Sequence, residues 1–522
     1  MGKPYSYHTF ILPCEIKEKG KNFAKKDVKD VVNTKYWEKV QEDTHSSFYS
    51  VFLDEKELKD REKVYSAIAY NQRQYFHDNV LKAIHSFGKD DIVTEYKFKF
   101  NDEFEKTIEL ETNRLCIPST GEATINSAGS GEENKKFRYI LKVSNIRLKA
   151  YNTGIHVLIL ELYNDLYKTF ENVKEINELG RRISLPYIAN KNGVIACAES
   201  VNWMFLGNIG KYDFRKANEE IWEDDENSND IYKIDFLDKI MIEEEDRNIY
   251  EIQPSLDDRM FTCSVIQNNC LSNMFKLDYD ISASEEERYK ELSKSLYEYI
   301  YIDKEGDYSA ATFSFRKNIL NESIYSRWSE YGTVYGVSHT SLVAITGECE
   351  SLDAKIIRPF LTQYVEIAIL AIVQRASILR FQRQSSGNLE NKDIQDLQKR
   401  YINYRNQLHF FEVSSQEQGI ELYELIRKQL YIEKEIESLE KNLEILYEKS
   451  NVDMSNKIGA VGIFIAAISL IGTLFDLIAY FRQYGCGSNF LMKFFYRVPE
   501  NIICICAFWY ILYLIYKYKK KD

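Results

Sequence analysis

Apolar residues are concentrated near the end of the chain, in two runs of different length. Residues 458–481 read IGAVGIFIAAISLIGTLFDLIAYF with a single charge, Asp476, and residues 502–516 read IICICAFWYILYLIY with none. A helix rises about 1.5 Å per residue and the hydrocarbon core of a bilayer is about 30 Å thick, so the first run can span it. Aromatic residues as far as 518 bring the second run to both interfaces. The pattern predicts transmembrane helices at 458–481 and 502–518, a loop at 482–501 and a basic tail at 519–522; two buried helices of a soluble protein are the alternative.

Basic residues around this hairpin predict its orientation. Lysines precede the first run and follow the second: Lys449, Lys457, Lys517, Lys519, Lys520 and Lys521. They outnumber the basic residues of the connection, which are Arg482, Lys493 and Arg497, and such an excess favours the cytoplasmic side. The first twenty residues lack the apolar core of a secretory signal. We therefore expect a multi-pass protein of the cell inner membrane with the N- and C-termini in the cytoplasm and an extracytoplasmic loop at 482–501.

The first 352 residues show the mixed periodicities of an α+β domain. Alternating apolar and polar residues predict strands at 137–143, 155–162 and within 327–347, with a turn at 152–154. Helical spacing predicts helices at 170–183 and 285–299. From residue 353 no strand pattern returns: 353–384 reads as an apolar helix interrupted by polar residues, which favours a buried helix over a span, and 389–411 as a second helix. We expect a cytoplasmic α/β domain at 1–352 and a helical region at 353–415.

A long stalk helix is predicted at 416–457. Residues 420–457 contain no Gly or Pro, and apolar residues form a heptad seam that Gln429 interrupts once: Leu422, Leu425, Ile432, Ile436, Leu439, Leu443 and Leu446. One helix from residue 418 to 481 would be about 95 Å long. Two interpretations stay open at this point, a rigid lever that enters the bilayer and a solvated helix packed on its own domain.

Small and polar residues recur at three-four spacing on one face of the first span. We call this set the polar stripe: Ser455, Gly459, Gly462, Ala466, Ser469, Thr473 and Asp476. Small residues allow helices to approach closely in lipid, which is a purely structural role. A carboxylate in hydrocarbon costs several kcal/mol, however, and a ring of carboxylates around an axis favours cations. We predict that the polar stripe lines a pore; the alternative places Asp476 at the far interface, in water.

Composition narrows the classes of function. Lys and Arg number 68 and Asp and Glu 80, a formal net charge of −12, so a direct nucleic-acid partner held through phosphates is not expected. The nine cysteines form no CxxC pair. No Walker, GxSxG or HExxH sequence is present, so we do not expect an enzyme, and the third hypothesis, a membrane-anchored nucleotide hydrolase, is the least favoured. No motif marks a ligand pocket or a metal site, and no cofactor is required.

The order of cytoplasmic α/β domain, stalk helix, two spans and basic tail resembles the CorA family of divalent-cation channels. In that family the first span ends in a Gly-Met-Asn signature. The matching segment here is Tyr484, Gly485, Cys486, Gly487, Ser488, Asn489 and Phe490, which lacks the Met and is two residues longer. The resemblance implies an oligomeric funnel, a pentamer by analogy, in a lipid bilayer, with Mg²⁺ as a candidate ion.

The segments YSYHTFILP, INELGRRISLP, RWSEYGTVYGVSHTSLVAITG and ILAIVQRASILRF are similar to the CorA-like proteins encoded beside type III CRISPR systems. That resemblance implies an antiviral membrane effector. Its cytoplasmic domain would bind a small nucleotide messenger of the S-adenosylmethionine–AMP (SAM-AMP) class and then open an ion pore or disrupt the membrane. The alternative function is a constitutive Mg²⁺, Zn²⁺ or Co²⁺ transporter of ordinary CorA type.

Overall fold

The computed structural model of the chain describes residues 3–19, 32–40, 53, 55–85, 92–99, 107–114, 135–182, 189–190, 193–194, 202–205, 235–257, 259–275, 283–303, 312–349, 352–387 and 389–484. The expected loop 482–501 beyond Tyr484, the second span and the basic tail therefore lie outside the described residues. The chain divides into two compact units, Met1–Gln384 with Arg400–Leu439, and Ser385–Lys399 with Glu440–Asp522.

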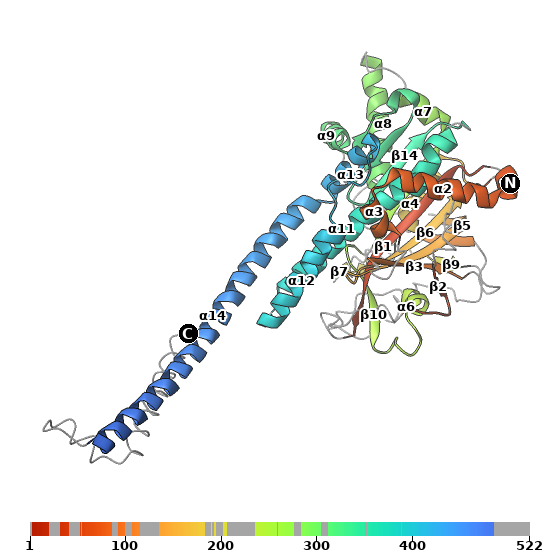
Figure 1. Cartoon of the computed structure of the whole chain (residues 1–522). Coiled ribbons are helices and arrows are strands. Elements are labelled where there is room, and N and C mark those ends of the chain that lie inside the picture. The colour runs from red at the N-terminus through yellow and green to blue at the C-terminus, as the bar shows by residue number, and fades with distance from the viewer. Residues whose placement is uncertain are drawn as a thin grey trace. The chain divides into compact units, whose positions relative to one another are not determined.

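The first unit is built on a large mixed sheet (Figure 1). Its strands are β1 (Ser6–Glu18), β2 (Trp37–Lys39), β3 (Val93–Phe98), β4 (Thr107–Arg114), β5 (Lys135–Tyr151), β6 (His156–Asn164), β9 (Asn202–Phe205), β10 (Tyr250–Pro254), β11 (Phe261–Gln267), β12 (Ile324–Tyr325), β13 (Val334–Val337) and β14 (Ser341–Thr346). The order is β12-β13-β14-β11-β1-β6-β5-β3-β2; β10 pairs with β1, and β4 pairs with β5 and β9. Only β11 and β14 are parallel among the pairs described. The strands β7 (Ala189–Asn190) and β8 (Gly193–Val194) form a separate pair.

The helices of the described residues lie before, between and after these strands. Those preceding the C-terminal region are α1 (Glu55–Lys59), α2 (Arg61–Tyr75), α3 (Asp78–Ile84), α4 (Phe170–Gly180), α6 (Asp235–Met241), α7 (Asn269–Phe275), α8 (Ala283–Tyr301), α9 (Phe313–Ser323) and the 3₁₀ turn η3 (Ser329–Tyr331). The π-helical turns η4 (Asp353–Ile357) and η5 (Phe360–Tyr364) lead into α11 (Val365–Ser385), which is followed by α12 (Asn391–Gln407), α13 (Glu417–Gln429) and α14 (Ile432–Tyr484).

The central strand β1 is buried on both faces, and its single proline sits where the ladder permits it. β11 pairs with β1 over Ser6–Ile11 and β10 over Cys14–Glu18. Pro13 falls between these two pairings on that side, so its missing N–H breaks no hydrogen bond there. Its carbonyl still accepts from the Ser255 N–H at 2.8 Å.

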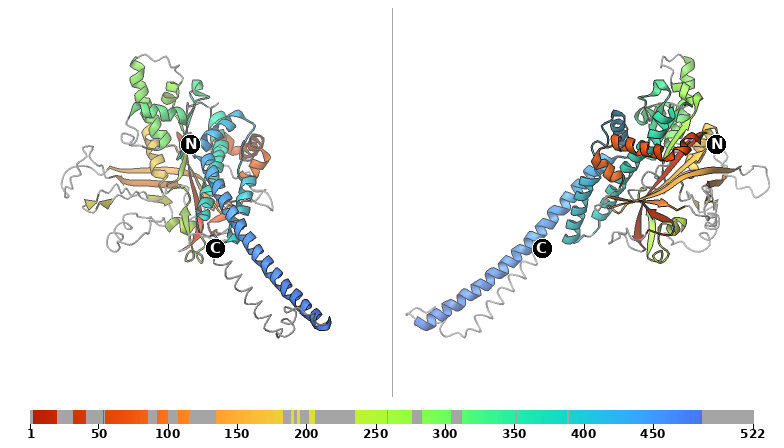
Figure 2. Two further views of the ribbon diagram at one scale, coloured as in Figure 1. Left: turned by 90° about the vertical axis from the view of Figure 1, so that its left-hand side faces the viewer. Right: turned by 45° about the vertical axis from the view of Figure 1, so that its right-hand side comes forward.

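Helices cover both faces of the sheet, as side-chain alternation along β13 shows. Val334 packs in an apolar cluster with Ile300 of α8, whereas the next residue, Tyr335, contacts the rings of Phe360 and Tyr364 in η5 at centroid distances of 6.5 and 5.6 Å. Successive strand residues point to opposite faces, so α8 and the η5–α11 segment cover opposite sides. The helix α2 lies beside that segment in both views of Figure 2.

Most sequence expectations for this part are confirmed. The strands at 137–143 and 155–162 lie within β5 and β6, and Gly154, with φ of 81°, completes the predicted turn between them. Helices α4 and α8 lie where helical spacing placed them. The apolar helix at 353–384 is η4–η5–α11, whose most apolar 18-residue stretch is 83% buried, as expected of a core helix rather than a span.

The expectation of one helix from residue 418 to 481 is wrong at its start. Helix α13 ends at Gln429 and α14 begins at Ile432, because Tyr431 adopts a left-handed φ of 56° that no helix contains. From Ile432 onward the helix is unbroken to Tyr484. Seam residues at the base of α14, such as Ile432 and Leu439, are fully buried inside the first unit, which favours packing of this part of the stalk on its own chain.

The left-handed Tyr431 allows a test of this junction. A left-handed conformation costs a non-glycine residue about 1–2 kcal/mol, and glycine avoids that cost while losing about 0.5–1 kcal/mol through its freer unfolded state. Tyr431→Gly is therefore expected to raise the free energy of unfolding by up to about 1 kcal/mol, measured by denaturation of the full chain in detergent. Tyr447→Gly, at an exposed helical position of α14, should lower it by about 1 kcal/mol. Destabilisation by both changes would contradict the assignment.

Candidate functional site

All seven residues of the polar stripe lie on one continuous helix, α14. At 100° per residue they occupy a single face. From Ser455 to Asp476 the rise is about 31 Å, close to the thickness of a hydrocarbon core. The structure thus brings the predicted residues together as one line along one element.

No side chain of the described residues covers the small residues of the polar stripe. A Cβ atom built on Gly459 or Gly462 meets nothing within 4 Å. The two hydroxyls of the stripe bond to their own helix: Ser469 Oγ donates to the Ile465 carbonyl at 3.0 Å and Thr473 Oγ1 to the Leu470 carbonyl at 2.9 Å. The stripe is therefore free for close approach by another helix, and its hydroxyls need no further donor or acceptor.

Two described helices are long and apolar enough to cross a membrane, and their surroundings differ. Asp353–Ser385 is largely buried in the first unit, whereas the most apolar stretch within Ile432–Leu477 is 0% buried. Large side chains are exposed along it: Ile458, Val461, Ile463, Phe464, Ile465, Ile468, Leu470, Phe475 and Leu477. Contiguous apolar surface of this extent marks a membrane or protein contact. The predicted pore-mouth segment begins at Tyr484, the last residue of α14, and Gly485–Phe490 lie outside the described residues.

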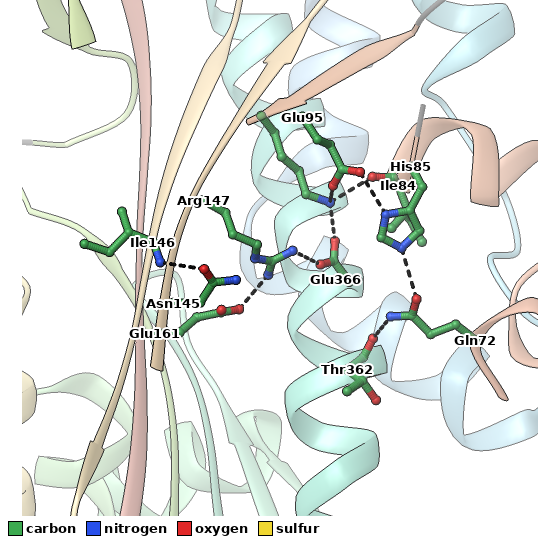
Figure 3. Close-up of polar contacts among 11 residues, drawn as sticks. Gln72, Ile84, His85, Glu95, Asn145, Ile146, Arg147, Glu161, Thr362 and Glu366 are labelled. Atoms are coloured by element: carbon green, nitrogen blue, oxygen red, sulfur yellow. Dashed lines mark hydrogen bonds and ion pairs between the residues drawn. The ribbon is translucent and has the colours of Figure 1, made fainter. Parts of the chain in front are cut away.

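A second candidate site is a buried set of charges between the sheet and α11, which we call the buried charge cluster: His85, Glu95, Arg147, Lys149, Glu161 and Glu366 (Figure 3). Lys149 Nζ lies 2.7 Å from Glu366 Oε2 and 3.1 Å from Glu95 Oε1. Arg147 bridges Glu366 and Glu161, each at 2.7 Å. Two cations on β5 thus join β3, β6 and α11.

These contacts keep the carboxylates ionised despite their burial. Burial opposes ionisation of Glu366, but Lys149 and Arg147 outweigh it and lower its pKa to about 2. The same balance, with Lys149 and His85 as the charges, holds the pKa of Glu95 well below its usual range.

Hydrogen bonds assign the proton of His85. Gln72 Nε2 donates to the Thr362 carbonyl, so Gln72 Oε1 accepts from His85 Nε2, 3.0 Å away. Glu95 accepts from His85 Nδ1 at 3.1 Å. Both ring nitrogens therefore donate, the bonding of an imidazolium, and three cations balance three carboxylates.

Sequence reasoning did not find this cluster. The available signal was weak: Arg147 and Lys149 share one face of a strand, and Glu366 interrupts an apolar helix. Spacing alone does not show that these residues meet, because their partners lie more than 200 positions apart.

Ser6, His8 and Asn177 form a hydrogen-bonded series like that of a hydrolase triad. Ser6 Oγ lies 2.9 Å from His8 Nε2, and His8 Nδ1 lies 2.7 Å from Asn177 Oδ1. Asn164 Nδ2 also donates to Ser6 Oγ at 3.0 Å. All three residues of the series are at most 1% exposed, so a substrate does not reach the hydroxyl in this conformation. The arrangement satisfies buried polar groups of the core.

Within the described ranges, no group of three His, Cys, Asp or Glu side chains is placed to hold a metal ion. Comparison of the chain with protein-family models, with curated proteins and with solved structures finds no match. The physical properties of α14 and of the domain that precedes it are therefore the basis for a functional assignment.

Proposed function

We propose that the chain is a ligand-gated membrane effector of CorA-like type. In this proposal, copies of the chain assemble around an axis in the inner membrane, with α14 lining a cation pore or a membrane lesion. The cytoplasmic α/β domain binds a nucleotide messenger of the SAM-AMP class, the messenger that the resemblance to type III CRISPR-associated proteins implies. Membrane opening would then act as antiviral defence.

The single observation that carries the proposal is the surface of α14. The helix has an exposed apolar stretch long enough to span a bilayer, and a polar stripe with a carboxylate runs along one face. Lipid would cover the apolar side chains. Facing copies of the helix would cover the stripe, because the open space at Gly459 and Gly462 permits close packing. A soluble protein would leave this surface in water.

A ligand can open such a pore only through a higher affinity for the open state. The test is therefore flux into liposomes that contain the purified full chain, with and without nucleotide. Flux that requires nucleotide supports the proposal. Constitutive uptake of divalent cations would favour the ordinary CorA transporter, and nucleotide turnover without flux would favour a membrane-anchored hydrolase.

Removing the carboxylate of the polar stripe tests the pore directly. Asp476→Asn is expected to reduce the preference for cations over anions several-fold, because a ring of carboxylates raises the local cation concentration. The measurement is the reversal potential in planar bilayers. Asp453→Asn makes the same change on α14 before the apolar stretch and off the stripe, and it should leave selectivity unchanged. Identical selectivity in wild type and both variants would remove Asp476 from the pore.

A further inference from the structure

Four basic side chains from four parts of the first unit meet at one end of the sheet. We call them the Arg375 cluster: Arg181, Arg259, His339 and Arg375. Backbone contacts set three of the positions: Arg182 and Arg259 form an isolated antiparallel bridge, the Met260 N–H donates to the Arg181 carbonyl at 2.6 Å, and the Thr262 N–H donates to the Thr340 carbonyl at 2.9 Å. The end of α4, the start of β11 and the β13–β14 turn are thus joined.

The acidic partners at this end are already engaged. Glu178 pairs with both Arg181, at 2.6 Å, and Arg182. Asp257 pairs with Arg259 at 3.1 Å. Arg375, on α11, makes no hydrogen bond and no ion pair within 4 Å with any described residue, and its Nε is buried. A half-buried guanidinium without a partner is unusual, because it has five N–H donors to satisfy.

The electrostatics agree with unneutralised positive charge. His339 has its pKa lowered by partial burial and then by the charges of Arg375, Arg259 and Arg181. The pKa of Arg375 is lowered by burial, although Glu435, Tyr431 and Asp257 act against this. The pKa of Arg181 is also lowered, again first by burial, with Arg259 and Arg182 adding to the effect. An anion placed among these groups would relieve their mutual repulsion.

The position of Arg375 links this end of the sheet to α14. Glu435, in the first turn of α14, and Tyr431, just before it, both act electrostatically on Arg375. Glu435 is itself held by α11, since Gln382 Nε2 donates to its Oε2 at 2.8 Å. A charge bound at Arg375 is therefore felt at the base of the helix that carries the polar stripe.

We propose that the Arg375 cluster binds a phosphate-bearing anion, with Arg375 as the principal contact and Arg259 and His339 on the exposed side. Guanidinium groups match phosphate oxygens in a planar, two-point geometry, which favours phosphate over a simple halide. The binding rests on the cluster alone. Its consequence, a signal to α14, rests on the proposed function and identifies where the gating ligand places its phosphate.

The test measures binding of inorganic pyrophosphate to the full chain in detergent by titration calorimetry at low ionic strength. Removing one charge-assisted contact costs about 1.5–3 kcal/mol, so Arg375→Gln is expected to weaken binding by about 10-fold or more. Arg375→Lys, which keeps the charge but loses the planar contact, should fall between. Arg73→Gln, at an exposed position of α2, is the matched control and should bind as wild type does.

Several results would overturn the proposal. These are absence of pyrophosphate binding to folded wild type, equal affinity in wild type and Arg375→Gln, and tighter binding of a dicarboxylate such as succinate. If Arg375→Gln does not fold, Arg259→Gln changes a largely exposed side chain and must weaken binding instead. Because no membrane is needed, binding without flux rejects only the channel, and nucleotide-dependent flux without pyrophosphate binding rejects only this site.

Discussion

Replacing Lys149 by methionine is expected to lower the free energy of unfolding by about 3–5 kcal/mol, because it leaves buried carboxylates without their cation. Lys149 is 0% exposed. Its Nζ contacts Glu366, Glu95 and the Ile84 carbonyl, the last at 2.8 Å. Methionine fills a similar volume, so the loss is electrostatic rather than a cavity. Denaturant midpoints of the full chain in detergent measure the effect.

A matched control lies on the same strand. Lys142, also on β5, pairs with Asp165 at 2.5 Å but is 35% exposed. Lys142→Met is expected to cost at most about 1 kcal/mol, since solvent screens such a pair. Adding Glu366→Gln to Lys149→Met should recover part of the loss, because one uncompensated carboxylate disappears. Equal effects of the two lysine variants would show that the buried charge cluster contributes no more than a surface pair.

The elements that sequence patterns predict well are those in which local periodicity and burial agree. β6 alternates and pairs as expected, and the apolar helix at 353–384 is buried because its polar residues are satisfied: Gln374, for example, donates to the Leu408 carbonyl at 2.6 Å. The polar stripe is likewise a local property, since one helix carries all its residues. The CorA-like funnel and its subunit number depend on other copies and remain predictions.

Features that depend on distant residues were not predictable in this way. The break at Tyr431 interrupts a stretch without Gly or Pro, where helix propensity gives no warning. Its environment explains it: Arg427 donates to the Phe410 carbonyl at 2.8 Å and Gln429 to the Glu322 carbonyl at 3.0 Å, so contacts with distant loops hold the end of α13. The buried charge cluster and the Arg375 cluster also form only once the sheet has brought its strands together.

Helix α11 connects these features within the first unit. Near its start Glu366 is bound to two strands through Arg147 and Lys149. Near its middle is Arg375, and near its end Gln382 holds Glu435 of α14. Because the buried charge cluster fixes the first part of α11 firmly, a force produced at Arg375 would act on the more weakly held contact at Glu435. The order of contacts along α11 therefore favours transmission toward α14 over loosening of the sheet.

Mild acid is expected to destabilise the first unit through His8. Burial lowers the pKa of His8 to about 4, although the hydrogen bond to Asn177 acts against this, whereas an unfolded histidine has a pKa near 6.5. Between these values the unfolded chain binds a proton that the folded chain refuses. Stability is thus complete above about pH 6.5 and falls as the pH drops to about 4. A difference of about 2.5 pKa units corresponds to roughly 3 kcal/mol.

The structural reason is the saturated surroundings of the ring. His8 Nδ1 donates to Asn177 and Nε2 accepts from Ser6, so a second proton on Nε2 would face a hydroxyl that must reverse its bond, in a site that is 0% exposed. Denaturation midpoints of the full chain at pH 7, 6, 5 and 4 should decline steadily in wild type. His8→Gln, which cannot titrate, should start lower but lose about 3 kcal/mol less over this interval. Parallel decline in the two proteins would place the acid sensitivity elsewhere, and a buried neutral imidazole in β1 would no longer account for it.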